Sequence, residues 1–267
     1  MHMEQEWSHY RTVKSVRGQA LDEEDAKKKS RRFRRELKVW SRLRHDNIVP
    51  LYGTVSGFGR FIALVCPWYD NGSLSSYLES HGETLSIINR FQLLSDVSAG
   101  LQYLHSCSVV HGDLTGSNVL ISSNGRACLS DFGLSVLVVD FVGTSYFTSA
   151  LNGTVRWIAP ELLAIPEEGE IMIPTSNSDI YSFGCIFFQV LTGKPPYSEF
   201  KRDAQVVVAI SLGTKPLRPE FPAIIDHYWN FILDCWSIKD CRPSSQQVAE
   251  YIKDQLYHLQ HDTPSPD

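Results

Sequence analysis

Several features that would assign the chain to a common class are missing from its 267 residues. Six cysteines are present, but they form no Cys-x-x-Cys pair and no Cys/His spacing typical of a zinc site. Most of them lie in apolar stretches, where a free thiol behaves as a small hydrophobic group, and this favours a reducing, intracellular compartment. No apolar run approaches the ~18–20 residues that cross a bilayer, and the first residues contain no apolar core of a signal peptide. We therefore expect a soluble, cytoplasmic protein with no membrane partner.

An excess of positive charge is also missing, because the formal net charge is -5. A general nucleic-acid binder is usually basic, so that class is disfavoured. The exception is Lys27–Arg35, which carries seven positive charges in nine residues. It is read either as a nuclear-localisation or nucleic-acid patch or as the solvated face of a helix, and we favour the helix. The sequence does not indicate an oligomeric state.

Strand patterns come first along the chain. With 43% apolar and 21% charged residues, the composition is that of a globular domain. Residues 7–17, 48–55 and 61–66 are predicted strands, and the last two are separated by a glycine-rich turn at 56–59. Between the first two strands, an apolar stripe at helical spacing predicts a helix; its members are Phe33, Leu37, Trp40 and Leu43.

Helical patterns dominate after residue 73. One amphipathic helix is marked by Phe91, Leu94, Val97, Leu101 and Leu104. Residues 179–191 are apolar almost all round, which predicts a fully buried helix that ends at Gly193. Two further helices are expected near 228–236 and 245–259. Strands followed by helices indicate an α+β fold, with a ligand cleft expected at the junction near residues 67–73.

The strongest motif occupies residues 111–120, on a loop between a predicted helix and a short apolar strand. It contains Asp113 and Asn118, five residues apart, whose side chains can face one point in space. Thirteen residues after Asn118 comes Asp131-Phe132-Gly133, and Ala159-Pro160-Glu161 closes the following loop. Each motif is weak alone, but their order is specific.

This order resembles that of the eukaryotic protein kinases. Asp113 and Asn118 match the catalytic loop of that family, Asp131 matches its metal-binding Asp-Phe-Gly, and residues 159–161 match the end of its activation segment. Two stretches, 45–53 and 153–157, are most similar to the tyrosine-kinase-like group.

The resemblance extends from about residue 11 to residue 258. It implies a two-lobed protein-kinase-like fold with a reduced N-terminal sheet lobe and a helical C-terminal lobe. Residues 1–69 would form a partial N-lobe with the hinge, 70–259 the C-lobe, and 260–267 a frayed tail.

The resemblance also implies a site for ATP and Mg²⁺. Asp113 would accept or orient the proton of a substrate hydroxyl, and Asn118 and Asp131 would hold magnesium ions through oxygen atoms. Lys14 would contact the α- and β-phosphates, and Glu36, 22 residues later, would be its partner. The plain alternatives are a solvated Lys14 and a Glu36 in an exposed helix salt bridge.

The adenine side of the site follows from the same resemblance. Cys66 would guard the back of the pocket, Pro67, Trp68 and Tyr69 would form the hinge that meets the adenine, and Leu120 would pack under the ring.

Two structural groups are implied as well. A hydrophobic stack would hold the lobes in register; its members are Trp40, Leu51, His111 and Phe132, anchored by Asp179. His111 is therefore expected to be structural rather than catalytic. Arg242 would pair with Glu161.

Departures from the family pattern affect the phosphate side. No glycine precedes Lys14, so the Gly-x-Gly-x-x-Gly loop is missing from these residues. Gly112 replaces the arginine that usually precedes the catalytic aspartate, which puts switching by loop phosphorylation in doubt. Thr115 stands where many serine/threonine kinases carry a lysine for the γ-phosphate.

These observations leave three hypotheses. The first is a protein kinase acting on a protein substrate of unknown identity, with Gly153-Thr154 favouring serine/threonine acceptors over tyrosine. The second is a pseudokinase that serves as a binding or scaffolding module, or a chain whose natural form supplies the missing loop. The third and weakest is nucleic-acid binding through Lys27–Arg35.

Overall fold

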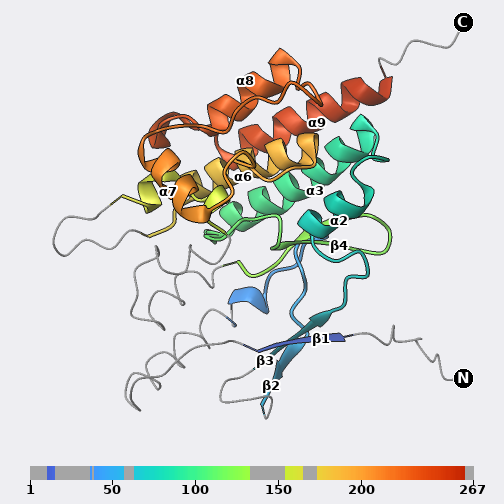
Figure 1. Ribbon diagram of the computed structural model, residues 1–267. Coiled ribbons are helices and arrows are strands. Elements are labelled where there is room, and N and C mark those ends of the chain that lie inside the picture. Colours follow the sequence, from blue (N-terminus) through green and yellow to red (C-terminus); the bar gives the residue numbers. More distant parts are fainter. Residues whose placement is uncertain are drawn as a thin grey trace, which may run out of the picture.

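The computed structural model describes residues 11–15, 37, 39–56, 63–132, 154–164 and 173–261. A small sheet lies below a larger, mostly helical part in Figure 1. The segment that joins them leaves the sheet at Pro67 and enters helix α2 (Leu74–His81). The predicted α+β fold, with a small sheet lobe and a mostly helical remainder, is confirmed.

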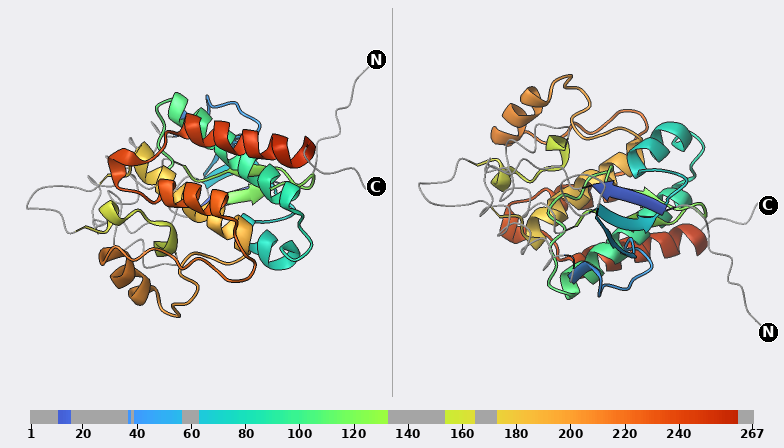
Figure 2. Two further views of the ribbon diagram at one scale, coloured as in Figure 1. Left: turned by 90° about the horizontal axis from the view of Figure 1, so that it is seen from above. Right: turned by 90° about the horizontal axis from the view of Figure 1, so that it is seen from below.

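The small sheet has three strands in the order β1-β3-β2, all antiparallel. They are β1 (Arg11–Ser15), β2 (Gly53–Val55) and β3 (Ala63–Pro67). The central strand β3 carries buried apolar side chains at Ala63, Leu64 and Cys66, which explains why it forms the middle of the sheet. The view from below in Figure 2 shows this sheet against the helical part.

The strand predicted over residues 48–55 is shorter than expected and begins only at Gly53. Ile48 instead forms an isolated parallel bridge with Leu129, and the main-chain nitrogen of Val49 donates to the oxygen of Leu129 at 3.0 Å. The start of the segment is therefore bonded to the large lobe and is not available to the small sheet. Two members of the apolar stripe predicted before this segment, Leu37 and Trp40, are helical and buried, whereas Leu43 is buried but lies beyond the helical residues.

Helix α3 (Ile87–Ser106) begins with a capping box in which Ser86 and Asn89 bond each other's main-chain nitrogens. Its predicted stripe is completely buried; the members are Phe91, Leu94, Val97, Leu101 and Leu104. α3 packs against α6 and along α9, so it holds these two helices of the large lobe together.

Helix α6 (Ser176–Thr192) is the centre of the large lobe, and 15 of its 17 residues are buried. Thr175 and Ser178 form its capping box, and it ends at Gly193 as predicted. A helix that is apolar all round is stable only when other elements cover every face. Here α3, α8 and the short helix η1 provide that cover.

The remaining described elements complete the large lobe. They are α2 (Leu74–His81), β4 (Val119–Ile121), β5 (Ala127–Leu129), η1 (Val155–Trp157), η2 (Pro160–Leu162), α7 (Asp203–Ser211), α8 (Asp226–Cys235), η3 (Lys239–Cys241) and α9 (Ser245–His261). β4 and β5 form an antiparallel hairpin. Within the described part of the chain, no helix has the length and apolar character needed to cross a bilayer.

Candidate active site

The loop of residues 111–118 joins the end of α3 to β4. In it, the Nδ2 atom of Asn118 donates to the Oδ2 atom of Asp113 at 2.9 Å and to the main-chain oxygen of Asp113 at 2.7 Å. The two side chains that were predicted to face one point are thus in direct contact. The bond orients the Asp113 carboxylate.

Asp131 reaches the same place from the end of β5. Both the main-chain nitrogen and the hydroxyl of the preceding Ser130 donate to the main-chain oxygen of Asn118, at 2.8 and 3.0 Å. Asp131 has a φ of 59°, a left-handed conformation that is strained for residues with a side chain and that concentrates at functional sites. The structure therefore brings Asp113, Asn118 and Asp131 together at one end of the β4–β5 hairpin.

The carboxylate of Asp179 on α6 holds this loop from behind. Its Oδ2 accepts the main-chain N–H of His111, and its Oδ1 accepts that of Gly112, both at 2.8 Å. His105 Nε2 lies 2.9 Å from the Oδ2 atom. Because Asp179 is only 1% exposed, these charge-assisted bonds form in a dry environment, where they fix the loop strongly.

The predicted stack between the lobes is present. The ring of Phe132 lies 5.0 Å from that of Trp40 and 6.2 Å from that of His111, both edge-on. Leu51 is buried in the same core. The Trp40 indole donates to the Val49 main-chain oxygen at 2.8 Å, which fixes the Trp40 end of the stack.

His111 is completely buried within this stack. Burial lowers the pKa of its imidazole below the ordinary 6.5, so the neutral form is favoured. Its Nδ1 atom accepts the main-chain N–H of Asp113 at 3.3 Å. These contacts agree with the expectation that His111 is structural.

The phosphate side of the predicted site is described only in part. Lys14 lies on β1, where it pairs with Leu64 of β3. Glu36, the Lys27–Arg35 run and the turn at 57–59 lie outside the described residues. The Lys14–Glu36 pair therefore stays a prediction.

The adenine side of the predicted site lies at the lobe junction. Cys66 is a buried cysteine on β3, Pro67 ends that strand, and Trp68 is 56% exposed. Tyr69 is half-buried beside Cys128, and burial raises the pKa of its phenol. Leu120 lies on β4 and forms a bridge with Ser73, just beyond the hinge. The structure places these residues at one junction, while contact with adenine stays a prediction.

The end of the predicted activation segment is anchored by Glu161 and Arg242. The Nη1 and Nη2 atoms of Arg242 donate to the two carboxylate oxygens of Glu161 at 2.6 and 2.8 Å. Arg242 also donates to the main-chain oxygens of Asn177 and Ser237 and lies over the ring of Tyr181. The predicted pairing is confirmed.

Two supporting residues were not found from the sequence. His105 contacts Asp179 from α3, and Arg156 of η1 donates to the main-chain oxygens of Pro196, Tyr197 and Phe200. The sequence context could have indicated the role of Arg156, because this cation stands between two residues that become buried, Val155 and Trp157, and a cation in such a place needs partners. No local spacing marked His105 as a partner of Asp179, which lies 74 residues away.

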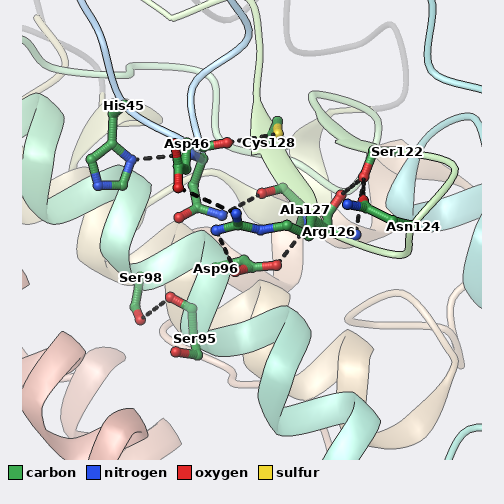
Figure 3. A network of polar contacts seen from close by, with 11 residues as sticks. His45, Asp46, Ser95, Asp96, Ser98, Ser122, Asn124, Arg126, Ala127 and Cys128 are labelled. Atoms are coloured by element: carbon green, nitrogen blue, oxygen red, sulfur yellow. Dashed lines mark hydrogen bonds and ion pairs between the residues drawn. The ribbon is translucent and has the colours of Figure 1, made fainter.

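A polar network joins residues 45–49 to the large lobe (Figure 3). Asn47 Nδ2 donates to the main-chain oxygen of Ala127 at 2.9 Å, and the main-chain nitrogen of Ala127 donates to Asp96 Oδ2 at 3.0 Å. Arg126 spans Asp46 and Asp96, at 3.3 and 3.7 Å. Because Asp96 and Asn47 are buried, this network holds the connection to the small lobe in place beside the β4–β5 hairpin.

The oxygen donors of the site fit magnesium. No three His, Cys, Asp or Glu side chains in the described ranges are grouped closely enough to hold a metal ion alone. Proteins often bind Mg²⁺ through one or two side-chain oxygens together with substrate phosphates, and Asn118 and Asp131 suit that mode. Because Nδ2 of Asn118 faces Asp113, its Oδ1 is the atom that would contact the ion.

Comparisons with known proteins agree with this geometry. A family model described as "Protein tyrosine and serine/threonine kinase" matches residues 4–252. The ephrin type-A receptor 5 of Homo sapiens is 31% identical over 228 residues, which are 84% of this chain and 21% of the receptor. The ephrin type-A receptor 3 of Danio rerio is 30% identical over 224 residues, 83% of this chain and 22% of the receptor. The chain thus spans about a fifth of the length of these relatives.

Proposed function

Because the chain belongs to the protein tyrosine and serine/threonine kinase family, we propose that it transfers the γ-phosphate of ATP to hydroxyl groups of protein substrates. The observation that carries this proposal is the bond between Asn118 and Asp113, which orients a carboxylate beside a second acidic residue, Asp131. Phosphoryl transfer requires mainly positioning and charge stabilisation. The three residues offer both.

The oxygen-bearing side chains have separate tasks in this proposal. Asp113 accepts or orients the proton of the acceptor hydroxyl. Asn118 and Asp131 hold magnesium, which when bound neutralises charge on the transferred phosphate. Asp179 keeps the loop in place through the N–H groups of His111 and Gly112.

The nucleotide-binding tasks are assigned by resemblance. Lys14 contacts the α- and β-phosphates, and Glu36 is its partner. The adenine ring is held by the hinge of residues 67–69, between Cys66 and Leu120.

Serine and threonine are the proposed acceptors. Thr154, which follows Gly153 in the sequence, lines the same small pocket as Asp113, and this closeness supports the choice. Tyrosine is the alternative acceptor, since the family description includes both classes.

A second candidate is a pseudokinase that binds a partner without turnover. Residues 114–117, between Asp113 and Asn118, contain no lysine or arginine. Thr115, at the position of the family's lysine, is only 2% exposed and directs its side chain into the protein. A missing charge at the γ-phosphate can cost orders of magnitude in rate, and this observation favours weak or absent transfer.

The test replaces Asp113 by Asn. The amide can still accept the bond from Asn118 but cannot take a proton, so we expect transfer to fall by roughly 10²–10⁴-fold with the fold intact. Transfer of labelled γ-phosphate to peptides with Ser, Thr or Tyr acceptors measures it and also identifies the acceptor. Asp240→Asn, on exposed η3, is the matched control and should keep full activity.

Undiminished transfer by the Asp113→Asn variant contradicts the proposed role. A wild-type chain that binds Mg-ATP but transfers nothing to any of the peptides supports the pseudokinase instead.

A further inference from the structure

A small pocket lies directly beneath the catalytic loop. Its lining includes Asp113 and Thr115 of the loop, Thr154 and Trp157 at η1, and Ser182 of α6. The space in this pocket that can hold the centre of a water molecule is about 10 Å³, which is about what one water molecule needs.

Two of the residues that line this pocket each carry a buried polar atom that has no hydrogen-bond partner among the residues that the structure describes. These atoms are the Oγ1 atom of Thr115 and the Nε1 atom of Trp157. Both residues are buried, at 2% and 7% exposure. A buried polar group without a partner destabilises the fold, so two such groups at one pocket indicate a shared ligand.

Three other polar side chains of the pocket, those of Ser178, Asp179 and Ser182, have hydrogen-bond partners, and that of Thr154 is only half-buried. Ser182 donates to the main-chain oxygen of Trp157 at 2.7 Å, and Ser178 donates to that of Thr175 at 2.8 Å. Asp179 is bonded to the catalytic loop and to His105. The unmet hydrogen-bonding capacity is therefore concentrated on Thr115 and Trp157.

We propose that this pocket binds one ordered water molecule that accepts the N–H of Trp157 and bonds the hydroxyl of Thr115. An indole N–H only donates, whereas a hydroxyl both donates and accepts. Water satisfies both groups at once and has the size of the pocket. The water joins the catalytic loop to η1, two elements that are connected in sequence only through residues 119–154.

This bridge makes Thr115 a positioning residue. Its hydroxyl bonds the water, and the water bonds Trp157. In this way Thr115 helps to position the segment that begins with Thr154. With respect to catalysis the inference rests on the proposed function, because Thr154 is the residue beside Asp113 that we associate with the acceptor. The binding of the water itself does not depend on activity.

The presence of the water can be tested by whether the variant Thr115→Val has a lower or a higher melting temperature than the wild-type chain. Thr115→Val keeps the shape and removes the hydroxyl, so with a bridging water the melting temperature should fall by about 2–4 °C. Without the water, the same change removes an unsatisfied buried group, and the melting temperature should stay or rise. Thr115→Ser keeps the hydroxyl, so its melting temperature should fall less than that of Thr115→Val.

Thr192→Val is the matched control, because Thr192 is also buried and its hydroxyl donates directly to the Phe188 main-chain oxygen at 2.9 Å. Its melting temperature should fall by a similar amount. An unchanged or raised value for Thr115→Val beside a lowered value for Thr192→Val overturns the inference.

A crystal structure gives the second readout. Density for a water within hydrogen-bond distance of both atoms, lost in Thr115→Val, supports the bridge, and a protein atom at that position overturns it. If peptide phosphorylation is detected, KM for the peptide should rise in Thr115→Val while KM for ATP stays constant. Since stability and density need no turnover, failure of the water and failure of the kinase proposal can be told apart.

Discussion

At the residue scale, Gly112 occupies the position of the arginine expected in this family. Its φ is 77°, and its N–H donates to Asp179 at 2.8 Å. A side chain in this left-handed region costs roughly 1–2 kcal/mol, so Gly112→Ala should lower the free energy of unfolding by about that amount. Because the neighbouring Asp113 would shift with the loop, phosphate transfer should fall as well. Urea unfolding and the peptide assay measure the two effects.

Gly213 provides the control for Gly112. Its φ is 75° and an added β-carbon meets open space, so Gly213→Ala carries the same backbone cost away from the site. We expect a similar loss of stability with activity kept. Equal activity in both variants would show that the conformation at Gly112 does not matter for catalysis.

At the scale of elements, the pair of Glu161 and Arg242 ties η2 to the segment after η3. Arg242 is 2% exposed in its side chain, and the contact is bidentate. A lysine cannot reproduce this fork, so Arg242→Lys should lower the free energy of unfolding by about 1.5–3 kcal/mol. Chemical unfolding measures the change.

Arg126→Lys is the matched control for that pair. Arg126 is 45% exposed and contacts the exposed Asp46 at 3.3 Å and the buried Asp96 at 3.7 Å. Because neither contact is a bidentate fork and lysine keeps the charge, we expect a loss of only about 0–1 kcal/mol. A loss as large for Arg126 as for Arg242 would contradict the importance that we give to burial and bidentate geometry.

Helices were predictable at this scale because their signals are local. The periodic stripe of α3 and the continuous apolar run of α6 gave both helices, and Gly193 gave the end of α6. The sequence could not show that residues 48–52 lie outside the strand that begins at Gly53. Its apolar pattern fits a strand, and only the bond between Val49 and Leu129, 80 residues away, removes it from the sheet.

At the scale of the whole molecule, the site is assembled from contacts of different range. Asp113 and Asn118 are close in sequence, so their meeting could be predicted from spacing alone. The order of motifs along the chain added Asp131, Asp179 and the Glu161–Arg242 pair through resemblance. The contact of Asn47 with Ala127 and that of His105 with Asp179 join residues 80 and 74 positions apart with no local pattern. Only the folded structure shows these.

Nucleotide binding depends on both lobes together, and it can be tested without any substrate. If the site binds Mg-ATP without a glycine-rich loop before Lys14, the ligand stabilises the folded chain by mass action. At about a hundred times Kd this amounts to ~2.7 kcal/mol, a rise of several degrees in melting temperature. Asp131→Ala removes one proposed magnesium ligand and should abolish the magnesium-dependent part of the rise, whereas Asp240→Ala on exposed η3 should keep it. A wild-type chain that shows no rise at millimolar Mg-ATP would favour the pseudokinase, since Asp113, Asn118 and Asp131 would then be assembled without a nucleotide to act on.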